Sequence, residues 1–198
     1  MPSRNLALTF ALALAASLVA ACGAGAATPT PDPSAPCPGI DEQRAPGLYP
    51  DLEALLPATL EGHAPVTLDS GRYCSAKTLG SLLAAGVAEL RFAGATWPDD
   101  GGQTGIAMVV YRAPGLTVDA VADSFASGAG TARGVNQVHA EAIDFDGQPG
   151  VRVTAMSGDR PQIVIIRSYL QAGTIAVVIG SGVTEARVRA AAEVFYAP

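Results

Sequence analysis

Hydrophobic residues recur along this chain in two rhythms, and the first of them predicts β-strands. In one segment Val151 and Val153 alternate with Arg152 and Thr154, which is typical of an antiparallel strand with one buried face. Residues 175–179 are apolar at every position, so we expect a central strand covered on both sides. Connections rich in Gly, Pro and Asp predict tight turns between neighbouring strands. Six strands are predicted in this way: residues 89–96, 106–112, 138–145, 151–156, 163–170 and 175–179.

The second rhythm, apolar residues three and four positions apart, predicts three amphipathic helices. Thr117 and Thr184 stand where helix N-caps belong, and Gly128 is expected to end the second helix. Gly80 and Gly86 weaken the first helix, so a loop leading into a strand remains its alternative. The apolar faces consist of Leu79, Leu82, Leu83 and Gly86 in the first helix, Val118, Val121, Ala122 and Phe125 in the second, and Val188, Ala191, Ala192 and Phe195 in the third.

The order of these elements indicates the fold class. A run of antiparallel strands, interrupted by one helix and closed by another, is typical of an α+β protein with helices packed on a sheet. We therefore expect a mostly antiparallel β-sheet with two or three packed α-helices. Residues 40–198 have the length of a single globular domain.

The N-terminus has the pattern of an export signal. Arg4 precedes an apolar run that ends at Cys22, and small residues come directly before that cysteine. The run is shorter than the roughly 20 residues that a membrane-spanning helix needs. The segment resembles a bacterial lipobox, which implies a lipoprotein signal over residues 1–21 and acylation of Cys22, with anchoring to a membrane of the cell envelope. The alternative is ordinary secretion, with cleavage near Ala26. Residues 22–39, rich in proline and small residues, are expected to form a tether.

Cysteine usage agrees with export. The chain has three cysteines, and assigning Cys22 to lipid leaves Cys37 and Cys74 as a pair. We expect these two to form a disulfide bond, because an oxidising compartment permits one. A metal or redox pair is the alternative, but there is no Cys-x-x-Cys and only His63 and His139 could add nitrogen ligands.

Charge argues against two classes of partner. The formal net charge is −6, with Lys77 as the only lysine and the arginines dispersed along the chain. Nucleic acids and anionic head groups are bound by clustered Lys and Arg. We therefore expect no nucleic-acid partner.

Motifs of common catalytic and metal sites are missing from the sequence. It contains no Gly-x-Ser-x-Gly, His-Glu-x-x-His, Walker or Ser-x-x-Lys motif. The glycines at 180–182 fit either an anion-binding turn or a tight strand-to-helix connection. Asp99 with Asp100, and Asp144 with Asp146, fit either calcium ligation or ordinary turn chemistry. We expect no cofactor and no metal site.

A few remaining residues have both a functional and a structural interpretation. His139 and Glu141 lie on one face of a predicted strand, where they could act as an acid/base pair or simply face solvent. Trp97, at a strand end, could line a ligand groove or cover one end of a core. Tyr73, Tyr111 and Tyr169 are the other aromatic candidates for such a groove.

The second half of the chain shows one wider resemblance. Residues 116–195 give helix, four strands and helix, with Gly147-x-Pro149-Gly150-x-Arg152 before a strand pair. Together with the lipobox, this order resembles the PsbP-like class of small exported proteins, which includes photosystem subunits, envelope lipoproteins and transport-associated proteins. The resemblance implies a fold, and it maps no catalytic motif onto this chain.

Three functions follow as expectations. The first is a non-enzymatic, membrane-anchored envelope lipoprotein with a protein-binding or accessory role at the cell surface. The second is a carrier or sensor of an apolar small molecule or lipid, held between sheet and helices. The third is an enzyme with a cleft that contains His139, Glu141 or Ser181. A cavity larger than ordinary packing voids would favour the second.

Overall fold

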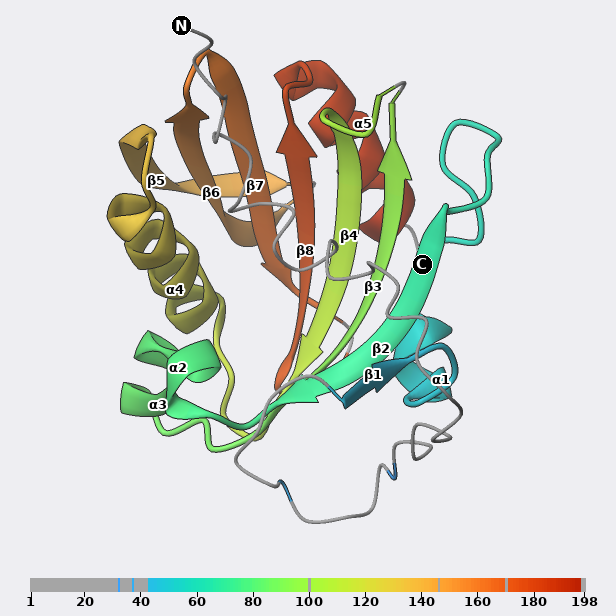
Figure 1. Cartoon of the computed structure of the whole chain (residues 1–198), viewed down its shortest axis with the longest axis vertical. Helices are drawn as coiled ribbons and strands as arrows, with labels where there is room; N and C mark the ends of the chain where they lie inside the picture. Colours follow the sequence, from blue (N-terminus) through green and yellow to red (C-terminus); the bar gives the residue numbers. More distant parts are fainter. Residues whose placement is uncertain are drawn as a thin grey trace, which may run out of the picture.

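A single antiparallel β-sheet organises the molecule (Figure 1). The computed structural model describes Asp32, Cys37 and residues 43–99, 101–145, 147–169 and 171–196. Within them the strands lie in the order β1-β2-β3-β4-β8-β7-β6-β5, and every neighbouring pair is antiparallel. The strands are β1 (Gln43–Ala45), β2 (Thr67–Tyr73), β3 (Leu90–Pro98), β4 (Gly105–Arg112), β5 (Val135–Phe145), β6 (Gln148–Ser157), β7 (Arg160–Ser168) and β8 (Thr174–Ser181).

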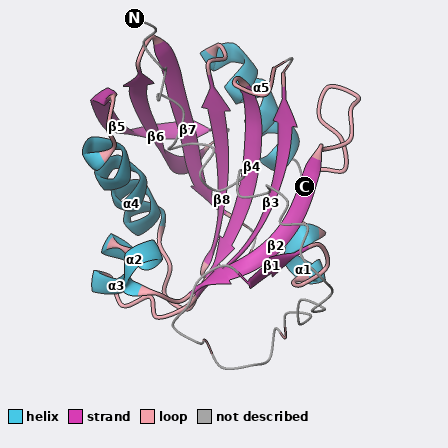
Figure 2. Ribbon diagram, in the orientation of Figure 1, coloured by secondary structure: helices cyan, strands magenta, loops and turns pink. Residues whose placement is uncertain are grey.

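Helices cover both faces of this sheet, which gives three layers (Figure 2). On one face α1 and α5 pack against alternate residues of β3, β4, β7 and β8. On the other face α2, α3 and α4 pack against the remaining alternate residues. The predicted α+β class is therefore confirmed. The helices are α1 (Pro50–Glu53), α2 (Ala76–Leu79), α3 (Ser81–Ala84), α4 (Val118–Thr131) and α5 (Glu185–Tyr196).

Strand β8 lies at the centre of the sheet, between β4 and β7. Its residues from Thr174 to Gly180 are all buried, because α5 covers one face and the α4 layer the other. This is the arrangement that the continuous apolar run predicts. No helix of the described segments is both long enough and apolar enough to cross a bilayer.

The ends of the two long helices follow from local chemistry. Thr117 Oγ1 accepts a hydrogen bond of 3.2 Å from Ala120 N, which confirms its predicted role as the N-cap of α4. Directly before α5, Thr184 Oγ1 likewise accepts a hydrogen bond of 3.4 Å from Arg187 N. The prediction that Gly128 ends α4 is wrong. The helix continues to Thr131, and the left-handed glycine after it is Gly134, with φ of +80°.

Two parts of the fold differ from the pattern-based prediction. The segment expected to form the first helix contains two four-residue helices, α2 and α3, divided at Gly80, whose φ is +51° and ψ is −125°. Elements β1, α1 and β2 were not predicted. In β2, Ser70 and Arg72 are buried polar residues, so the strand lacks an apolar alternation.

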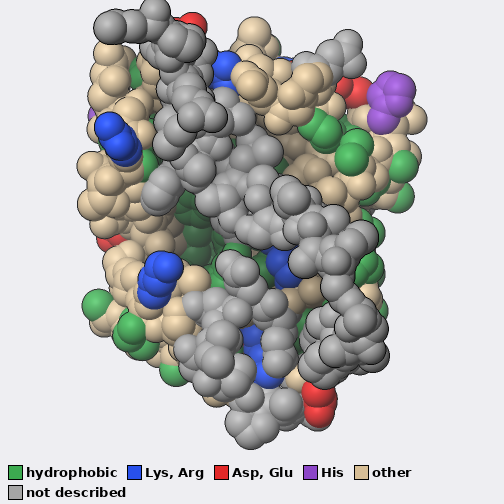
Figure 3. Space-filling model, viewed as in Figure 1, with side chains coloured by type: hydrophobic (Ala, Val, Ile, Leu, Met, Phe, Trp, Pro, Cys, Tyr) green, Lys and Arg blue, Asp and Glu red, His purple; other side chains and the backbone are tan. Residues whose placement is uncertain are grey.

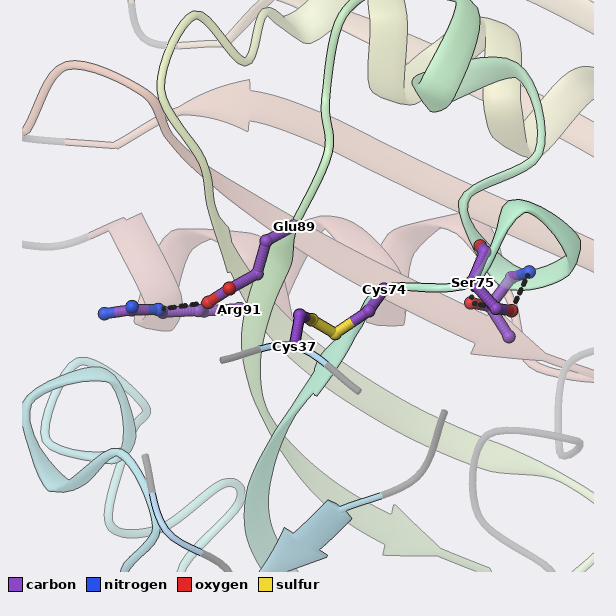
Figure 4. The surroundings of a disulfide bond; sticks show 6 residues. Cys37, Cys74, Ser75, Glu89 and Arg91 are labelled. Carbon is purple, nitrogen blue, oxygen red and sulfur yellow. Dashed lines mark hydrogen bonds and ion pairs between the residues drawn. A yellow bond between two sulfur atoms is a disulfide. The ribbon is translucent and has the colours of Figure 1, made fainter. Parts of the chain in front are cut away.

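The predicted disulfide bond joins Cys37 to Cys74, with their Cα atoms 5.9 Å apart (Figure 4). Cys74 directly follows β2, and the next residue, Ser75, accepts a hydrogen bond from Thr78 N as the N-cap of α2. The bond therefore ties the segment that precedes the sheet to the junction between β2 and α2. The predicted signal at residues 1–21 and Cys22 lie outside the described residues.

Candidate ligand-binding cavity

A cavity of about 660 Å³ lies between the sheet and the layer of helices α2, α3 and α4. Packing voids in protein interiors rarely exceed the size of a water molecule, whereas small-molecule sites span roughly 300–1,000 Å³. Figure 3 views the molecule from this face, where apolar side chains are visible in a recess beside α4. The opposite face, under α5, is filled by a continuous apolar cluster.

Inward-facing residues of three strands form the floor of the cavity. Val153 and Ala155 come from β6, Val164 from β7 and Ile179 from β8. All four are buried in the sheet. They pair across the strands, with Val153 opposite Val164 and Val164 opposite Ile179. The floor is therefore a row of apolar side chains that runs across the sheet.

Helix α4 supplies the wall opposite the floor. Val121 and Phe125 contribute apolar surface, and Ser124, Ser127 and Thr131 contribute hydroxyl groups. Because residues three and four apart share a face of a helix, these side chains follow one line along α4. The wall is thus amphipathic along the length of the cavity.

The far end of the cavity is aromatic and aliphatic. Tyr73, Leu82, Leu90 and Tyr111 line it. Burial raises the pKa of Tyr111, so its phenol stays neutral. In the register of β8, Tyr111 lies opposite Ile175 and Gln162 opposite Ser181, six residues along the strand. The cavity therefore extends over about 20 Å at roughly 3.3 Å per residue.

The near end of the cavity is polar. Arg160 and Gln162 occupy inward positions of β7, in line with Val164. Gln162 Nε2 donates a hydrogen bond of 2.7 Å to Ser181 Oγ on β8. Arg160 Nη2 donates one of 2.6 Å to Gln103 Oε1. Arg160 Nη1 and Gln162 Oε1 are buried and have no hydrogen-bond partner among the described residues.

The charge of the lining is opposite to that of the whole chain. Lys77 and Arg160 are the charged residues that line the cavity, which has no Asp, Glu, His or Cys among its described lining residues. The chain as a whole carries −6. The arrangement is suited to holding a molecule with an apolar body and a polar end.

Of the residues considered for catalysis, only Ser181 lines the cavity. His139 and Glu141 lie on β5, an edge strand, with His139 Nε2 3.7 Å from Glu141 Oε2. The His139 side chain is 69% exposed, and Glu141 forms an ion pair with Arg152. The structure therefore does not bring these three candidates together.

The glycines around Ser181 serve the tight connection to α5. A Cβ atom on Gly180 would lie 2.2 Å from Val188 Cγ2, so only glycine permits this approach of strand and helix. Gly182 has φ of +63°, the left-handed region that favours glycine. The structural interpretation of residues 180–182 accounts for both glycines.

The aspartates considered for calcium have other partners. Both oxygens of Asp99 accept hydrogen bonds from Arg187, at 2.8 and 2.9 Å, and Thr104 donates to one of them. Asp144 Oδ1 accepts from Gly147 N at 2.8 Å within a turn. Asp100 and Asp146 lie outside the described residues. Within the described segments no three His, Cys, Asp or Glu side chains gather in a way that could hold a metal ion.

The aromatic candidates divide between the two faces of the sheet. Tyr73 and Tyr111 line the cavity. Trp97 is buried on the opposite face, where its Nε1 donates a hydrogen bond of 2.9 Å to His63 O, and so it covers one end of that core. Tyr169 packs against Phe195 of α5.

Comparison with known proteins yields a distant structural similarity. No protein-family model matches the chain, and no curated protein matches it. The solution structure of cyanobacterial PsbP (CyanoP) from Synechocystis sp. PCC 6803 is similar to 69% of this chain and 92% of its own, with 15% sequence identity and a TM-score of 0.29. The resemblance is distant.

Sequence reasoning missed Arg160 and Gln162, the residues of the polar end. The signal was present, because both share the parity of Val164 and Ile166 on β7. Polar side chains in the inward row of a strand are unusual in a closed core and often mark a binding site.

Proposed function

We propose that this protein is a lipid-anchored envelope protein whose domain binds an apolar or amphipathic small molecule. The observation that carries the proposal is the cavity of about 660 Å³ between the sheet and helices α2 to α4. Its volume lies within the usual range of ligand sites. A cavity larger than packing voids is the feature that separates a carrier or sensor of a small molecule from an ordinary packed domain.

Hydrophobic burial supplies the driving force for binding. A chain or ring seated on Val153, Val164 and Ile179, opposite Val121 and Phe125, removes apolar surface of both molecules from water. Such burial is worth about 25 cal/mol per Å². The polar near end then orients the molecule within the cavity.

The N-terminal sequence and the disulfide bond support a location at the cell envelope, outside the cytoplasm. Acylation of Cys22 would hold the domain at an envelope membrane by a tether, and two or more acyl chains anchor stably where one is marginal. The disulfide bond between Cys37 and Cys74 fits an oxidising compartment. Replacing Cys22 by Ser is expected to abolish incorporation of radiolabelled palmitate. Undiminished labelling of that variant would rule out this site of attachment.

A cavity-filling variant tests the binding function. Ala155→Phe places a ring on the floor of the cavity, whereas Ala140→Phe makes the same change at an exposed position of edge strand β5. N-phenyl-naphthylamine, a neutral dye that fluoresces in apolar surroundings, is the probe. We expect saturable binding to the parent protein and to Ala140→Phe, and a loss of about tenfold or more in affinity for Ala155→Phe.

Thermal unfolding of both variants shows whether the fold is kept. Equal dye affinity of all three proteins, with the fold intact, would place the dye elsewhere and contradict the proposal. Absence of saturable binding to the parent protein would contradict it as well.

A protein-binding role is the second candidate, favoured by two exposed apolar residues. Val66, just before β2, is 72% exposed, and Leu68 within β2 is 39% exposed. Both point to the same side, since alternate residues of a strand share a face. If a partner docks there, Val66→Asp is expected to abolish a crosslink in intact envelopes while dye binding stays unchanged. A crosslink that survives the substitution would exclude this surface.

A further inference from the structure

The polar end of the cavity contains two buried groups whose hydrogen-bonding capacity is not used by the protein. Arg160 Nη1 lacks an acceptor and Gln162 Oε1 lacks a donor among the described residues. Nearly all buried polar atoms in folded proteins have a partner, because an unpartnered one costs free energy. Both atoms belong to side chains that line the cavity. Their partners are therefore expected within the cavity itself.

Arg160 Nη1 and Gln162 Oε1 need different hydrogen-bonding partners. A guanidinium N–H donates only and carries positive charge, whereas an amide oxygen accepts only. Ser181 satisfies the amide nitrogen of Gln162, which leaves the oxygen to face another donor. A ligand that satisfies both atoms has a negatively charged oxygen and, beside it, a hydroxyl group.

The electrostatic setting favours an anion. Arg160 forms no ion pair with the described residues, in contrast to Arg152 and Arg187, which each contact two carboxylates. No described carboxylate lines the cavity. A buried guanidinium N–H without an acceptor costs free energy, and a charge-assisted hydrogen bond from Arg160 Nη1 to an anion offsets that cost.

We propose that the cavity binds a single-chain anionic amphiphile whose head group carries a hydroxyl, with the anionic oxygen on Arg160 and the hydroxyl on Gln162. The proposal rests on the ligand-binding function proposed above and specifies the ligand class. The apolar chain extends from this head group over Val164 and Ile179 toward Leu90 and Tyr111. The span of about 20 Å accommodates an extended chain.

A matched pair of amphiphiles tests the assignment. Monolauroylglycerol is neutral and has two free hydroxyls. In lysophosphatidic acid with the same lauroyl chain one of these hydroxyls is esterified by an anionic phosphate and the other stays free. Each is used to displace N-phenyl-naphthylamine from residues 23–198, a form without the lipid anchor that contains both apolar cores and the disulfide bond. We expect the parent protein to bind the anionic amphiphile about 10- to 100-fold more tightly, the range for one charged hydrogen bond.

Three arginine variants separate the head-group contact from general charge effects. Arg160→Gln is expected to abolish the preference for the anionic amphiphile and to keep the affinity for monolauroylglycerol within about threefold. Arg160→Lys should retain part of the preference, because it keeps the charge. Arg133→Gln makes the same change of net charge at an exposed residue that does not line the cavity, and it should leave the preference intact.

The outcomes distinguish this proposal from the proposed function. If the parent protein binds both amphiphiles equally and Arg160→Gln changes neither affinity, the head-group assignment is overturned while the binding function stands. If Arg133→Gln weakens the preference as much as Arg160→Gln does, the assignment is likewise overturned. If neither amphiphile displaces the dye and the dye itself does not saturate, both proposals fail.

Discussion

The hydrogen bond of 2.7 Å from Gln162 Nε2 on β7 to Ser181 Oγ on β8 fixes the amide at the near end of the cavity. Because the serine takes the amide nitrogen, the amide oxygen is held with its acceptor capacity unused. The pair lies in register, so no backbone adjustment is needed to form it. The inward row of this strand pair, apolar at Val164 and Ile179, thus ends in an oriented acceptor.

The hydrogen bond between Gln162 and Ser181 predicts that a substitution of Gln162 weakens ligand binding without lowering the stability of the fold. Gln162→Leu replaces a partly satisfied buried amide by an apolar side chain of similar size, so we expect the free energy of unfolding to stay equal or rise by about 1 kcal/mol. The affinity for the hydroxyl-bearing anionic amphiphile should fall several-fold, since the acceptor is lost. Urea denaturation and dye displacement measure the two effects. A loss of stability beyond about 2 kcal/mol would show that the amide serves the fold instead.

The contact between β8 and α5 predicts a steric effect at Gly180. A Cβ atom there would meet Val188 Cγ2 at 2.2 Å and Val183 Cγ2 at 2.8 Å, so Gly180→Ala is expected to lower the free energy of unfolding by about 1–3 kcal/mol. Gly130→Ala in α4 meets nothing within 4 Å and should raise it by about 0.5–1 kcal/mol. Chemical denaturation checks both.

A double-mutant cycle identifies the clash. Val188→Ala in the Gly180→Ala background should cost less than Val188→Ala alone, because the two changes share one contact. Simple additivity of the two losses would mean that the strand and the helix do not touch at this point.

The disulfide bond predicts dependence of stability on redox state. It closes a separation of 37 residues, and the double variant with Cys37→Ser and Cys74→Ser should lose roughly 2–4 kcal/mol of unfolding free energy. A reductant should lower the stability of the parent protein by the same amount and leave the double variant unchanged. An unfolding midpoint of the parent protein that stays the same with and without reductant would contradict the disulfide bond between Cys37 and Cys74.

The contact between Asp99 and Arg187 predicts acid sensitivity. Two hydrogen bonds from Arg187 hold the pKa of Asp99 below its ordinary value of 3.8. A carboxyl whose pKa is lowered on folding contributes stability above its unfolded pKa, and this contribution is lost as the pH falls through the folded value. The stability advantage of the parent over Asp99→Asn should therefore be present at neutral pH and shrink below about pH 4.

Urea midpoints measured from neutral to acidic pH compare the two proteins. A gap between them that is constant across that range would show that the ion pair does not couple to folding. The variant keeps the contact of Arg187 with Glu61, so the difference in stability between the two proteins reports the contact of Arg187 with Asp99.

Most of the strands from β3 to β8 were predicted because each has an apolar row facing a helix layer; the edge strand β5, in which Phe145 alone is fully buried, is the exception. Strand β2 was missed, since Ser70 and Arg72 are buried through polar partners that no periodicity shows: Ser70 Oγ bonds Tyr49 N and Glu53 Oε1. The end of α4 was misplaced because a helix tolerates a glycine such as Gly128 in its interior. Thr131 Oγ1 closes its last turn with hydrogen bonds to the carbonyls of Ser127 and Gly128.

The site was less accessible to prediction than the fold. A cavity depends on the spacing between α4 and the sheet, which the sequence does not show. Apolar side chains around a cavity have the same sequence pattern as those of a filled core. Arg160 and Gln162 were the available signal. The apolar pattern predicts that strand β7 begins at Ile163, so both residues fall outside the predicted strand. The strand in fact begins at Arg160, and the turn before it is only two residues long.

The central claim is that the cavity holds a single-chain anionic amphiphile. Native mass spectrometry tests it most directly, on residues 23–198 exported to the envelope without the lipid anchor and purified without detergent. We expect one equivalent of a bound amphiphile, displaced by the lauroyl lysophosphatidic acid and missing from Ala155→Phe. A parent protein that carries no ligand and takes up none of the added amphiphile would contradict the claim.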